Sequence, residues 1–351
     1  MRVLEVIDGY SFGGIAKVIE DLSNNIENIS FDFLTATNIN NNWNMLNVDR
    51  RTLKGKIVYN YRLYKYLKKN KYDIVHINSA AFFYSFQVVL ICKMCKIKKI
   101  IVHSHGIPNI IFIKKILIRL LNPLYIKLTD VQLSCSKNAS KSLYTDEKNV
   151  IILKNGVDVN KYKYNEKIRN KIRKKLNIEN KIVYGHVGRF EKEKNHYFLI
   201  DLFYELQKNN DSVLLLVGIG SLENKIKDKV INLGIQDKVI FLGFKDNIGE
   251  LLCAMDLFIF PSLCEGLGIS VIEAQTSGLP TVVSSCVPEE ANISDRFIKI
   301  FSYNKEEWVK QILKIGKIER KNCYKDTIKS GYDIKKCSKE LEKIYKKLNE
   351  K

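Results

Sequence analysis

The sequence lacks the features of a membrane-spanning or disulfide-stabilised protein. Its longest apolar stretch, residues 80–92, has 13 residues, whereas a transmembrane helix needs about 18 or more. The eight cysteines follow no repeating spacing, and the only Cys-x-x-Cys pair, Cys92 and Cys95, has no second pair to complete a metal site. Only five apolar-rich residues separate Met1-Arg2 from Asp8, too few for the core of a signal peptide. We therefore expect reduced thiols in a cytoplasmic protein.

The composition is that of a globular chain with a strong basic excess. Among 351 residues, 46% are hydrophobic and 27% charged, which excludes a disordered or fibrous protein. The length predicts two domains. The 58 basic and 38 acidic side chains give a net charge of +20, of which residues 1–155 carry +12 (23 basic, 11 acidic). Such a surface attracts nucleic acid, anionic lipid or phosphorylated ligands without choosing among them.

Short runs rich in valine and isoleucine alternate with helical periodicity, a pattern typical of parallel sheets covered by helices on both faces. The expected strands are Val3–Ile7, Phe31–Thr35, Ile74–Ile77, Ile100–His103, Val150–Leu153, Ile182–Val187, Val213–Val217, Val239–Leu242, Leu257–Phe260 and Thr281–Ser284. The expected helices include Ile15–Ile29, Ile110–Leu121 and Ser136–Tyr144, with helical pattern alone from Lys305 onward. The sequence therefore predicts an α/β fold of two doubly wound, Rossmann-like domains, 1–155 and 156–330. A C-terminal helix, 331–351, could pack back on the first domain.

Ligands of open α/β sheets bind beyond the carboxyl ends of the strands, so the residues that follow each strand are candidates. After the first strand, Gly13 and Gly14 precede a helix and could bring a ligand to free backbone N–H groups; a plain tight turn is the alternative. After Ile182–Val187 come Gly188, Arg189 and Lys194, which could clamp a diphosphate; a solvated charged loop is the alternative.

The most informative segment is Pro261 to Ala274. It contains Glu265, the turn Gly266-Leu267-Gly268 and Glu273, which is expected two turns into a helix over Ile269–Thr276. Carboxylates suit sugar hydroxyls, and glycine amides at a helix N-terminus suit phosphate, so the combination favours a nucleotide-sugar site. An acid near a helix N-terminus can instead serve only as a dipole partner.

Together these motifs resemble those of retaining glycosyltransferases of family 4, the "glycosyl transferases group 1" enzymes of GT-B fold, whose two domains face each other across a cleft. The resemblance is carried by Glu265-x7-Glu273 after Pro261-Ser262, by Gly188-Arg189 with Lys194, by Asn155-Gly-Val-Asp158, by Leu216-Val-Gly-Ile-Gly220 and by Phe241-Leu-Gly-Phe244. It covers essentially the whole chain.

The resemblance assigns roles to these residues. Arg189 and Lys194 would hold the diphosphate and stabilise the leaving group, Glu265 the donor sugar and Glu273 the ribose. Phosphate or sugar would meet the amides of Gly266, Leu267 and Gly268. Gly243 and Phe244 would lie by the base, and Gly13 and Gly14 would cover the phosphates.

Two histidines follow the strand Ile100–Val102. His105, directly before Gly106, best fits the family's catalytic histidine near sugar and acceptor, and His103 stays open. His76 is a weaker candidate, expected at the mouth of the cleft, and His186 is interpreted as structural. A structural strand-end role is the alternative for His105.

The segment Ile110–Leu121 is apolar with cations at Lys114, Lys115 and Arg119. This pattern is typical of a helix that rests in a membrane interface, and it is equally typical of a helix that packs on the sheet.

The resulting interpretation is a hexosyltransferase-type enzyme that moves a sugar, with retained configuration, from a UDP-linked donor to a hydroxyl of a lipid-linked glycan. We expect no metal or other cofactor, since no Asp-x-Asp cluster is present. The expected location is the cytoplasm or the inner face of the plasma membrane. A UDP-sugar epimerase of the same fold is the first alternative, and a basic nucleic-acid-binding protein is the second and weaker one. Nucleic acid is not an expected partner, because no nucleic-acid-binding motif accompanies the charge.

Overall fold

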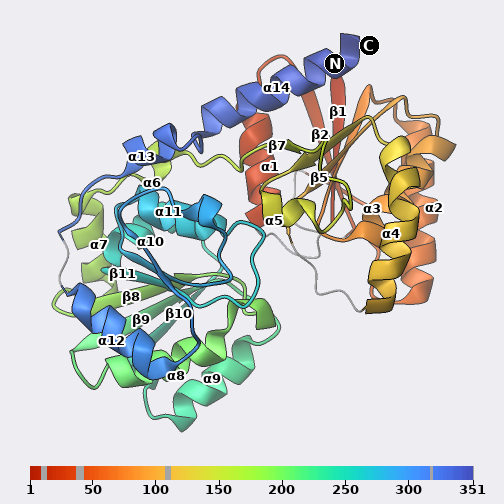
Figure 1. Ribbon diagram of the computed structural model, residues 1–351. Coiled ribbons are helices and arrows are strands. Elements are labelled where there is room, and N and C mark those ends of the chain that lie inside the picture. The colour runs from red at the N-terminus through yellow and green to blue at the C-terminus, as the bar shows by residue number, and fades with distance from the viewer. Residues whose placement is uncertain (9–13, 37–42, 107–111, 317–318, 351) are drawn as a thin grey trace. The chain divides into compact units, whose positions relative to one another are not determined.

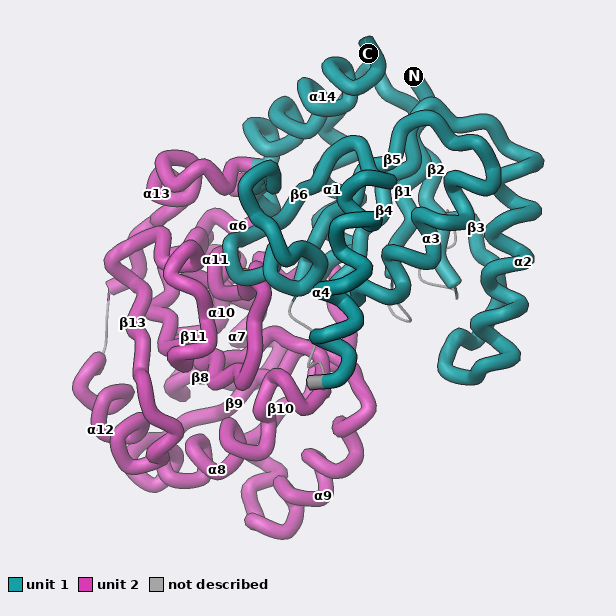
Figure 2. Tube along the Cα trace, turned by 45° about the vertical axis from the view of Figure 1, so that its right-hand side comes forward, with its two compact units in different colours: residues 1–156, 334–351 teal, residues 157–333 magenta. Residues whose placement is uncertain are grey.

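The computed structural model describes residues 1–8, 14–36, 43–106, 112–316 and 319–350. The chain forms two compact units, Met1–Gly156 with Ile334–Lys351 and Val157–Asp333, shown in different colours in Figure 2. Each unit is built on a parallel sheet with helices on its faces (Figure 1).

The first unit contains a seven-stranded sheet in the order β3-β2-β1-β4-β5-β6-β7. Its strands are β1 Arg2–Ile7, β2 Ser30–Thr35, β3 Asn44–Met45, β4 Ile74–Ser79, β5 Lys99–Ser104, β6 Val131–Ser134 and β7 Ile151–Ile152. Its helices are α1 Gly14–Asn24, α2 Leu53–Lys69, α3 Phe82–Met94, α4 Phe112–Lys127, α5 Lys137–Ser140 and α14 Ile334–Glu350. The strand order reverses between β1 and β4, as in doubly wound folds.

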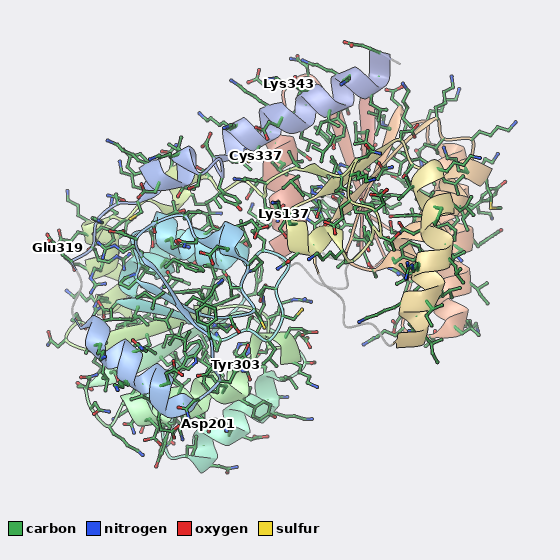
Figure 3. The ribbon with its side chains drawn as sticks, in the orientation of Figure 1. Lys137, Asp201, Tyr303, Glu319, Cys337 and Lys343 are labelled. Atoms are coloured by element: carbon green, nitrogen blue, oxygen red, sulfur yellow. The ribbon has the colours of Figure 1, made fainter. Side chains whose placement is uncertain are left out.

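The C-terminal helix α14 belongs to the first unit because one of its faces is apolar. Its buried side chains include Cys337, Leu341 and Tyr345, four residues apart along the helix (Figure 3 labels Cys337). Ser338 Oγ also donates a hydrogen bond to the carbonyl oxygen of Leu22 at 2.9 Å, at the end of α1.

The second unit contains a six-stranded sheet in the order β10-β9-β8-β11-β12-β13. Its strands are β8 Ile182–Val187, β9 Ser212–Val217, β10 Val239–Gly243, β11 Leu257–Phe260, β12 Thr281–Ser284 and β13 Phe297–Ile300. Its helices are α6 Val159–Tyr162, α7 Glu166–Leu176, α8 His196–Leu206, α9 Glu223–Asn232, α10 Ile248–Ala254, α11 Ile269–Thr276, α12 Lys305–Ile315 and α13 Tyr324–Lys329, with 3-10 turns η1 Lys192–Lys194, η2 Gln236–Lys238 and η3 Glu289–Ala291. The order reverses between β8 and β11, which pair directly.

The predicted fold of two Rossmann-like domains with a helical C-terminal segment is confirmed, with local corrections. The helix expected over Ile15–Ile29 ends at Asn24, and the one expected over Ser136–Tyr144 is confined to Lys137–Ser140. The strand expected over Val150–Leu153 has only two residues. Strands β3, β6 and β13 were not predicted, because all three are short and β6 carries the polar residues Gln132 and Ser134.

No helix within the described part of the chain is both long and apolar enough to cross a membrane.

Candidate active site

The candidate donor residues follow the two strands at which the second sheet reverses its order. Gly188 to Lys194 follow β8, and Pro261 to Gly268 follow β11. Chain connections leave these two adjacent strands toward opposite sides, so a ligand crevice opens at their carboxyl ends. The sheet topology therefore brings the two most informative loops of the sequence to one edge.

Glycines let three strand ends approach each other closely at this edge. A Cβ atom on Gly218, whose φ is +141°, would lie 2.1 Å from the carbonyl oxygen of Gly188. Gly218 N also donates to the carbonyl oxygen of Gly243 at 2.9 Å. Gly243 ends β10 with a φ of +67°, a conformation that favours glycine. The loops after β8, β9 and β10 are thus joined through backbone.

Lys194 and Glu265 form the ionic centre of the candidate site. Lys194 Nζ lies 2.5 Å from Glu265 Oε1, and Ser262 Oγ donates to the same oxygen at 2.5 Å. The Glu265 side chain is only 8% exposed. One carboxylate oxygen thus takes both donors, so the pair fixes the direction in which the other oxygen points.

The turn that carries Ser262 and Glu265 is held from two further elements. Tyr303 OH and Ser284 Oγ both donate to the carbonyl oxygen of Ser262, at 2.6 and 2.5 Å (Figure 3 labels Tyr303). Leu263 N donates to the carbonyl oxygen of Glu193 at 2.7 Å, which ties this turn to the loop after β8.

Glu273 lies on α11, which begins after Gly268. Gly268 is the N-cap residue, with a φ of +81°, so its role in the turn depends on the freedom of glycine. Glu273 is the fifth residue of α11, one turn into the helix rather than the two turns expected. Its Oε1 accepts a hydrogen bond from Tyr162 OH at 2.6 Å. Glu273 is therefore oriented by a residue 111 positions away in sequence.

The other predicted donor residues of the second unit lie at the same strand ends. The Arg189 side chain is exposed, and it forms no ion pair with any residue that the structure describes. Phe244 follows β10 and is 44% exposed. Gly266, Leu267 and Gly268 are buried between Glu265 and α11.

Within the first unit, the histidines that follow or line β4 and β5 form one buried cluster. The rings of His76 and His103 stack with centroids 5.4 Å apart, and those of His103 and His105 lie 3.9 Å apart. Burial and the nearby His76 lower the pKa of His105 to about 3. The expectation that His76 faces the mouth of the cleft is wrong: it is 1% exposed and hydrogen-bonds Tyr345 of α14. Gly14 begins α1, while Gly13 lies outside the described residues.

His186 is structural, as expected, since it is buried inside β8 with Nδ1 2.8 Å from the carbonyl oxygen of Ile259. Burial lowers the pKa of its imidazole to about 4. Its Nε2 would lie 2.7 Å from a Cβ atom on Gly188, so the histidine supports the loop after β8 from beneath.

Sequence reasoning missed the residues that orient the candidates: Ser262, Tyr162, Glu5 and Asn78. The first two could have been found from the sequence, because Ser262 precedes Glu265 by three residues and Tyr162 ends the segment that begins at Asn155. Nothing in the pattern marks Glu5 or Asn78, which contact the histidine cluster across β1, β4 and β5.

Two further observations concern other kinds of site. No group of three or more His, Cys, Asp and Glu side chains that could hold a metal ion occurs within the described ranges.

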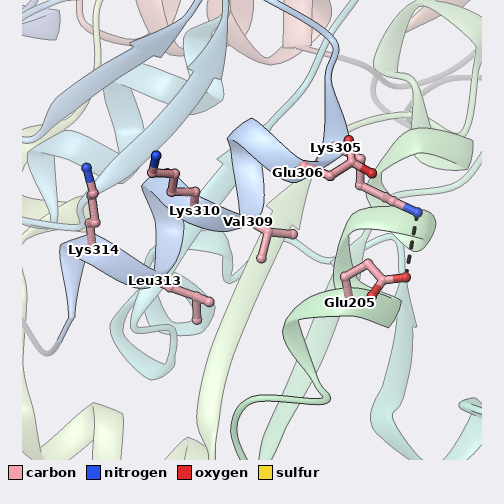
Figure 4. Close-up of a pocket in the computed structure, with 7 residues that line it drawn as sticks. All are labelled: Glu205, Lys305, Glu306, Val309, Lys310, Leu313 and Lys314. Atoms are coloured by element: carbon pink, nitrogen blue, oxygen red, sulfur yellow. Dashed lines mark ion pairs between the residues drawn. The ribbon is translucent and has the colours of Figure 1, made fainter.

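An open groove of about 680 Å³ lies between α8 and α12 and is lined by Glu205, Lys305, Glu306, Val309, Lys310, Leu313 and Lys314 (Figure 4). It shares no residue with the candidate site, and its side chains are mostly long and solvated.

Comparisons with known proteins agree with this geometry. Residues 168–333 match the family model described as glycosyl transferases group 1. The chain is 27% identical over 319 residues to the UDP-Gal:alpha-D-GlcNAc-diphosphoundecaprenol alpha-1,3-galactosyltransferase of Escherichia coli, covering 81% of this chain and 77% of that one. It is 24% identical to the putative glycosyltransferase EpsF of Bacillus subtilis, over 100% of this chain and 97% of that one.

Solved structures share the fold. A glycosyltransferase from Rickettsia africae superposes with a TM-score of 0.76 at 19% identity, covering 99% of this chain and 98% of that chain. Anabaena HepE in complex with UDP-glucose gives a TM-score of 0.73 at 17% identity, with 97% and 94% covered.

The two Rossmann-like domains, each with a doubly wound parallel sheet, have the GT-B fold. Most of the second unit, residues 168–333, matches the glycosyl transferases group 1 family, and the chain is a transferase enzyme.

The Lys194–Glu265 pair predicts a coupled effect on stability. Lys194→Ala leaves a carboxylate that is 8% exposed without its cation, so we expect the free energy of unfolding to fall by about 2 kcal/mol or more. Adding Glu265→Gln should recover part of this loss, because the neutral amide needs no counter-charge. Urea denaturation of the wild type, both single variants and the double variant measures the coupling. Additive effects would contradict the pairing.

Proposed function

We propose that this enzyme transfers a sugar from a UDP-linked donor to a hydroxyl of a lipid-linked glycan with retention of anomeric configuration. The Lys194–Glu265 contact is the observation that carries the proposal. The resemblance gives the lysine to the diphosphate and the glutamate to the sugar, which are adjacent groups of one nucleotide-sugar. A 2.5 Å contact between the two side chains suits that division.

The remaining groups extend the donor site in both directions. Arg189 adds an exposed planar guanidinium for diphosphate oxygens. Glu273, oriented by Tyr162, would accept hydrogen bonds from the ribose hydroxyls. Gly243 and Phe244 would lie by the base. No metal is needed in this scheme, because cations and helix amides meet the diphosphate.

In the proposed reaction the acceptor oxygen attacks the anomeric carbon on the face that the diphosphate leaves. The C1–O bond to the diphosphate breaks, the new C1–O bond forms, and the acceptor proton passes to a departing phosphate oxygen. Lys194 and Arg189 stabilise the negative charge that develops on the leaving group, which is where preorganised cations lower a barrier most. His105 would act near the sugar and acceptor.

The names of two relatives support the proposed classes of donor and acceptor. The E. coli relative is named for a UDP-galactose donor and a diphosphoundecaprenol-linked acceptor. Another relative, from Staphylococcus aureus, is named a capsular polysaccharide biosynthesis glycosyltransferase. Surface polysaccharide synthesis in the cytoplasm, at the inner face of the membrane, is the corresponding role.

Helix α4 supports a membrane contact for the first unit. Ile118, Asn122 and Tyr125 are buried, so one face packs on the unit. A second face is apolar and exposed, at spacings of three and four residues along the helix: Ile113 76%, Ile116 50%, Leu117 45%, Leu120 72% and Leu124 47%. Lys114, Lys115 and Arg119 are exposed beside it. The buried face agrees with a helix packed on the first unit, and the exposed apolar face beside the cations supports the proposed membrane contact.

The two glutamates should separate catalysis from binding. We expect Glu265→Ala to lower kcat at least about a hundredfold, because a group that orients the reacting sugar is lost. Glu273→Ala should instead raise the Kd for UDP about 10- to 100-fold, since hydrogen bonds to a charged group contribute about 1.5–3 kcal/mol. Radiometric transfer and titration calorimetry measure the two effects. Glu205→Ala, on the groove of Figure 4, is the matched control; wild-type behaviour of both site variants would refute the assignment.

Transfer should persist in excess EDTA, because Arg189 and Lys194 are proposed to replace a divalent cation at the diphosphate. The measurement is the initial rate with and without chelator, at saturating donor. Complete loss of activity that Mg²⁺ or Mn²⁺ restores would show that the phosphate site is wrongly assigned.

Membrane association should depend on the cations of α4. Each basic residue near an anionic leaflet contributes about 1 kcal/mol, so Lys114→Glu, Lys115→Glu and Arg119→Glu together should weaken vesicle binding at least about a hundredfold. Flotation with anionic vesicles at low salt measures this, and raising the salt should also release the wild type. Reversal of the exposed Lys171, Lys174 and Lys175 on α7 changes net charge equally and is the control. Equal flotation of both triple variants would contradict a role for α4.

A further inference from the structure

We propose that Glu5, acting through Asn78, holds the imidazole of His105 in the tautomer that carries its proton on Nε2, and that Tyr345 of the C-terminal helix holds Glu5 in place. Glu5 and Asn78 are then positioning residues for the chemistry, and Tyr345 links α14 to the site. The inference rests on the role proposed above for His105.

The hydrogen bonds define the tautomer step by step. Asn78 Nδ2 lies 2.6 Å from Glu5 Oε2, and Asn78 Oδ1 lies 3.0 Å from His105 Nε2. A carboxylate only accepts hydrogen bonds, so the amide must present its NH₂ group to Glu5 and its oxygen to His105. An amide oxygen also only accepts, and His105 Nε2 must therefore be the donor.

The reverse orientation of Asn78 would be unfavourable on both sides. It would set the amide oxygen against the Glu5 carboxylate, two acceptors 2.6 Å apart in a site from which water is excluded. A polar group left unpaired in such an interior is strongly unfavourable. Glu5 thus sets the tautomer of a histidine that it does not touch.

A second observation shows what this tautomer makes available. Burial keeps the pKa of His105 at about 3, so the ring carries a single proton at neutral pH. With that proton on Nε2, Nδ1 holds a lone pair. Nδ1 is buried and has no hydrogen-bond partner among the described residues. In the proposed role Nδ1 accepts a hydrogen bond from a hydroxyl group, and the ring of His103, with its centroid 3.9 Å away, packs against the imidazole.

The C-terminal helix completes the support. Tyr345 OH donates to Glu5 Oε1 at 2.7 Å, and His76 Nδ1 lies 2.7 Å from the same hydroxyl. Glu5 thus accepts from Asn78 on Oε2 and from Tyr345 on Oε1, which also lies 3.3 Å from His76 Nδ1, although its side chain has no exposure to solvent. These contacts span 340 residues of sequence.

Nitrogen NMR of the full chain with ¹⁵N-labelled histidine reads the tautomer directly. The His105 resonances, assigned by their loss in His105→Gln, should show a protonated Nε2 and an unprotonated Nδ1. Asn78→Ala and Glu5→Gln should mix the two tautomers and lower kcat at least about tenfold. Tyr345→Phe, which removes one oxygen atom, should shift the tautomer ratio in the same direction by a smaller amount.

A matched control separates this effect from loss of stability. Asn122 is a second buried asparagine of the first unit, where its Nδ2 donates to the carbonyl oxygen of Leu143 at 2.6 Å. Asn122→Ala should cost stability and leave the His105 tautomer unchanged. An Nδ1-protonated wild type, or an unchanged tautomer in Asn78→Ala and Glu5→Gln, would overturn the inference. Wild-type transfer by His105→Gln would refute the catalytic role of His105 while leaving the tautomer result intact.

Discussion

The candidate donor site depends on the parallel pairing of β8 with β11. Its register, with Leu257 opposite Tyr184, places the loops after both strands at one edge. The pairing is anchored at its other end by Asp256, whose Oδ2 accepts from Val183 N at 2.7 Å and which pairs with Arg169 and Arg173. Burial alone would raise the pKa of Asp256, but the two arginines lower it below its usual range. A charged clamp at the amino end thus sets the position of the charged loops at the carboxyl end.

The two sheets use the same strand order for different chemistry. At the reversal point of the second sheet, charged side chains follow the strands, as suits an anionic ligand. Near the reversal point of the first sheet, the polar groups are buried side by side on β1, β4 and β5. Glu5, His76, Asn78 and His105 hydrogen-bond one another, while one ring nitrogen of each of the three histidines has no partner among the described residues. Burying such groups is costly unless they are hydrogen-bonded. The network therefore costs stability, and it holds His105 in one orientation.

The features that were predicted correctly depend on residues close together in the sequence, whereas most of those that were missed depend on residues far apart. Strands Ile182–Val187, Leu257–Phe260 and Thr281–Ser284 and helix Ile269–Thr276 match the expected bounds, because buried apolar runs and the Gly268 turn are local signals. Strand β6 was missed because it is short and two of its four residues, Gln132 and Ser134, are polar. The orienting residues Tyr162 and Tyr345 were missed because their partners lie 111 and 340 residues away, and no periodicity encodes such contacts.

The segment Asn155-Gly-Val-Asp158 supports the candidate site through its backbone and through helix α6. A Cβ on Gly156 would lie 2.7 Å from Ile334 Cα, so only glycine lets the returning chain pass. Val157 N then donates to the carbonyl oxygen of Tyr332 at 2.7 Å, and Asp158 caps α6 by accepting from Asn160 N. Helix α6 ends with Tyr162, whose hydroxyl orients Glu273. Gly156, Val157 and Asp158 thus connect the point where the chain crosses, through α6 and Tyr162, to the carboxylate proposed to hold the ribose.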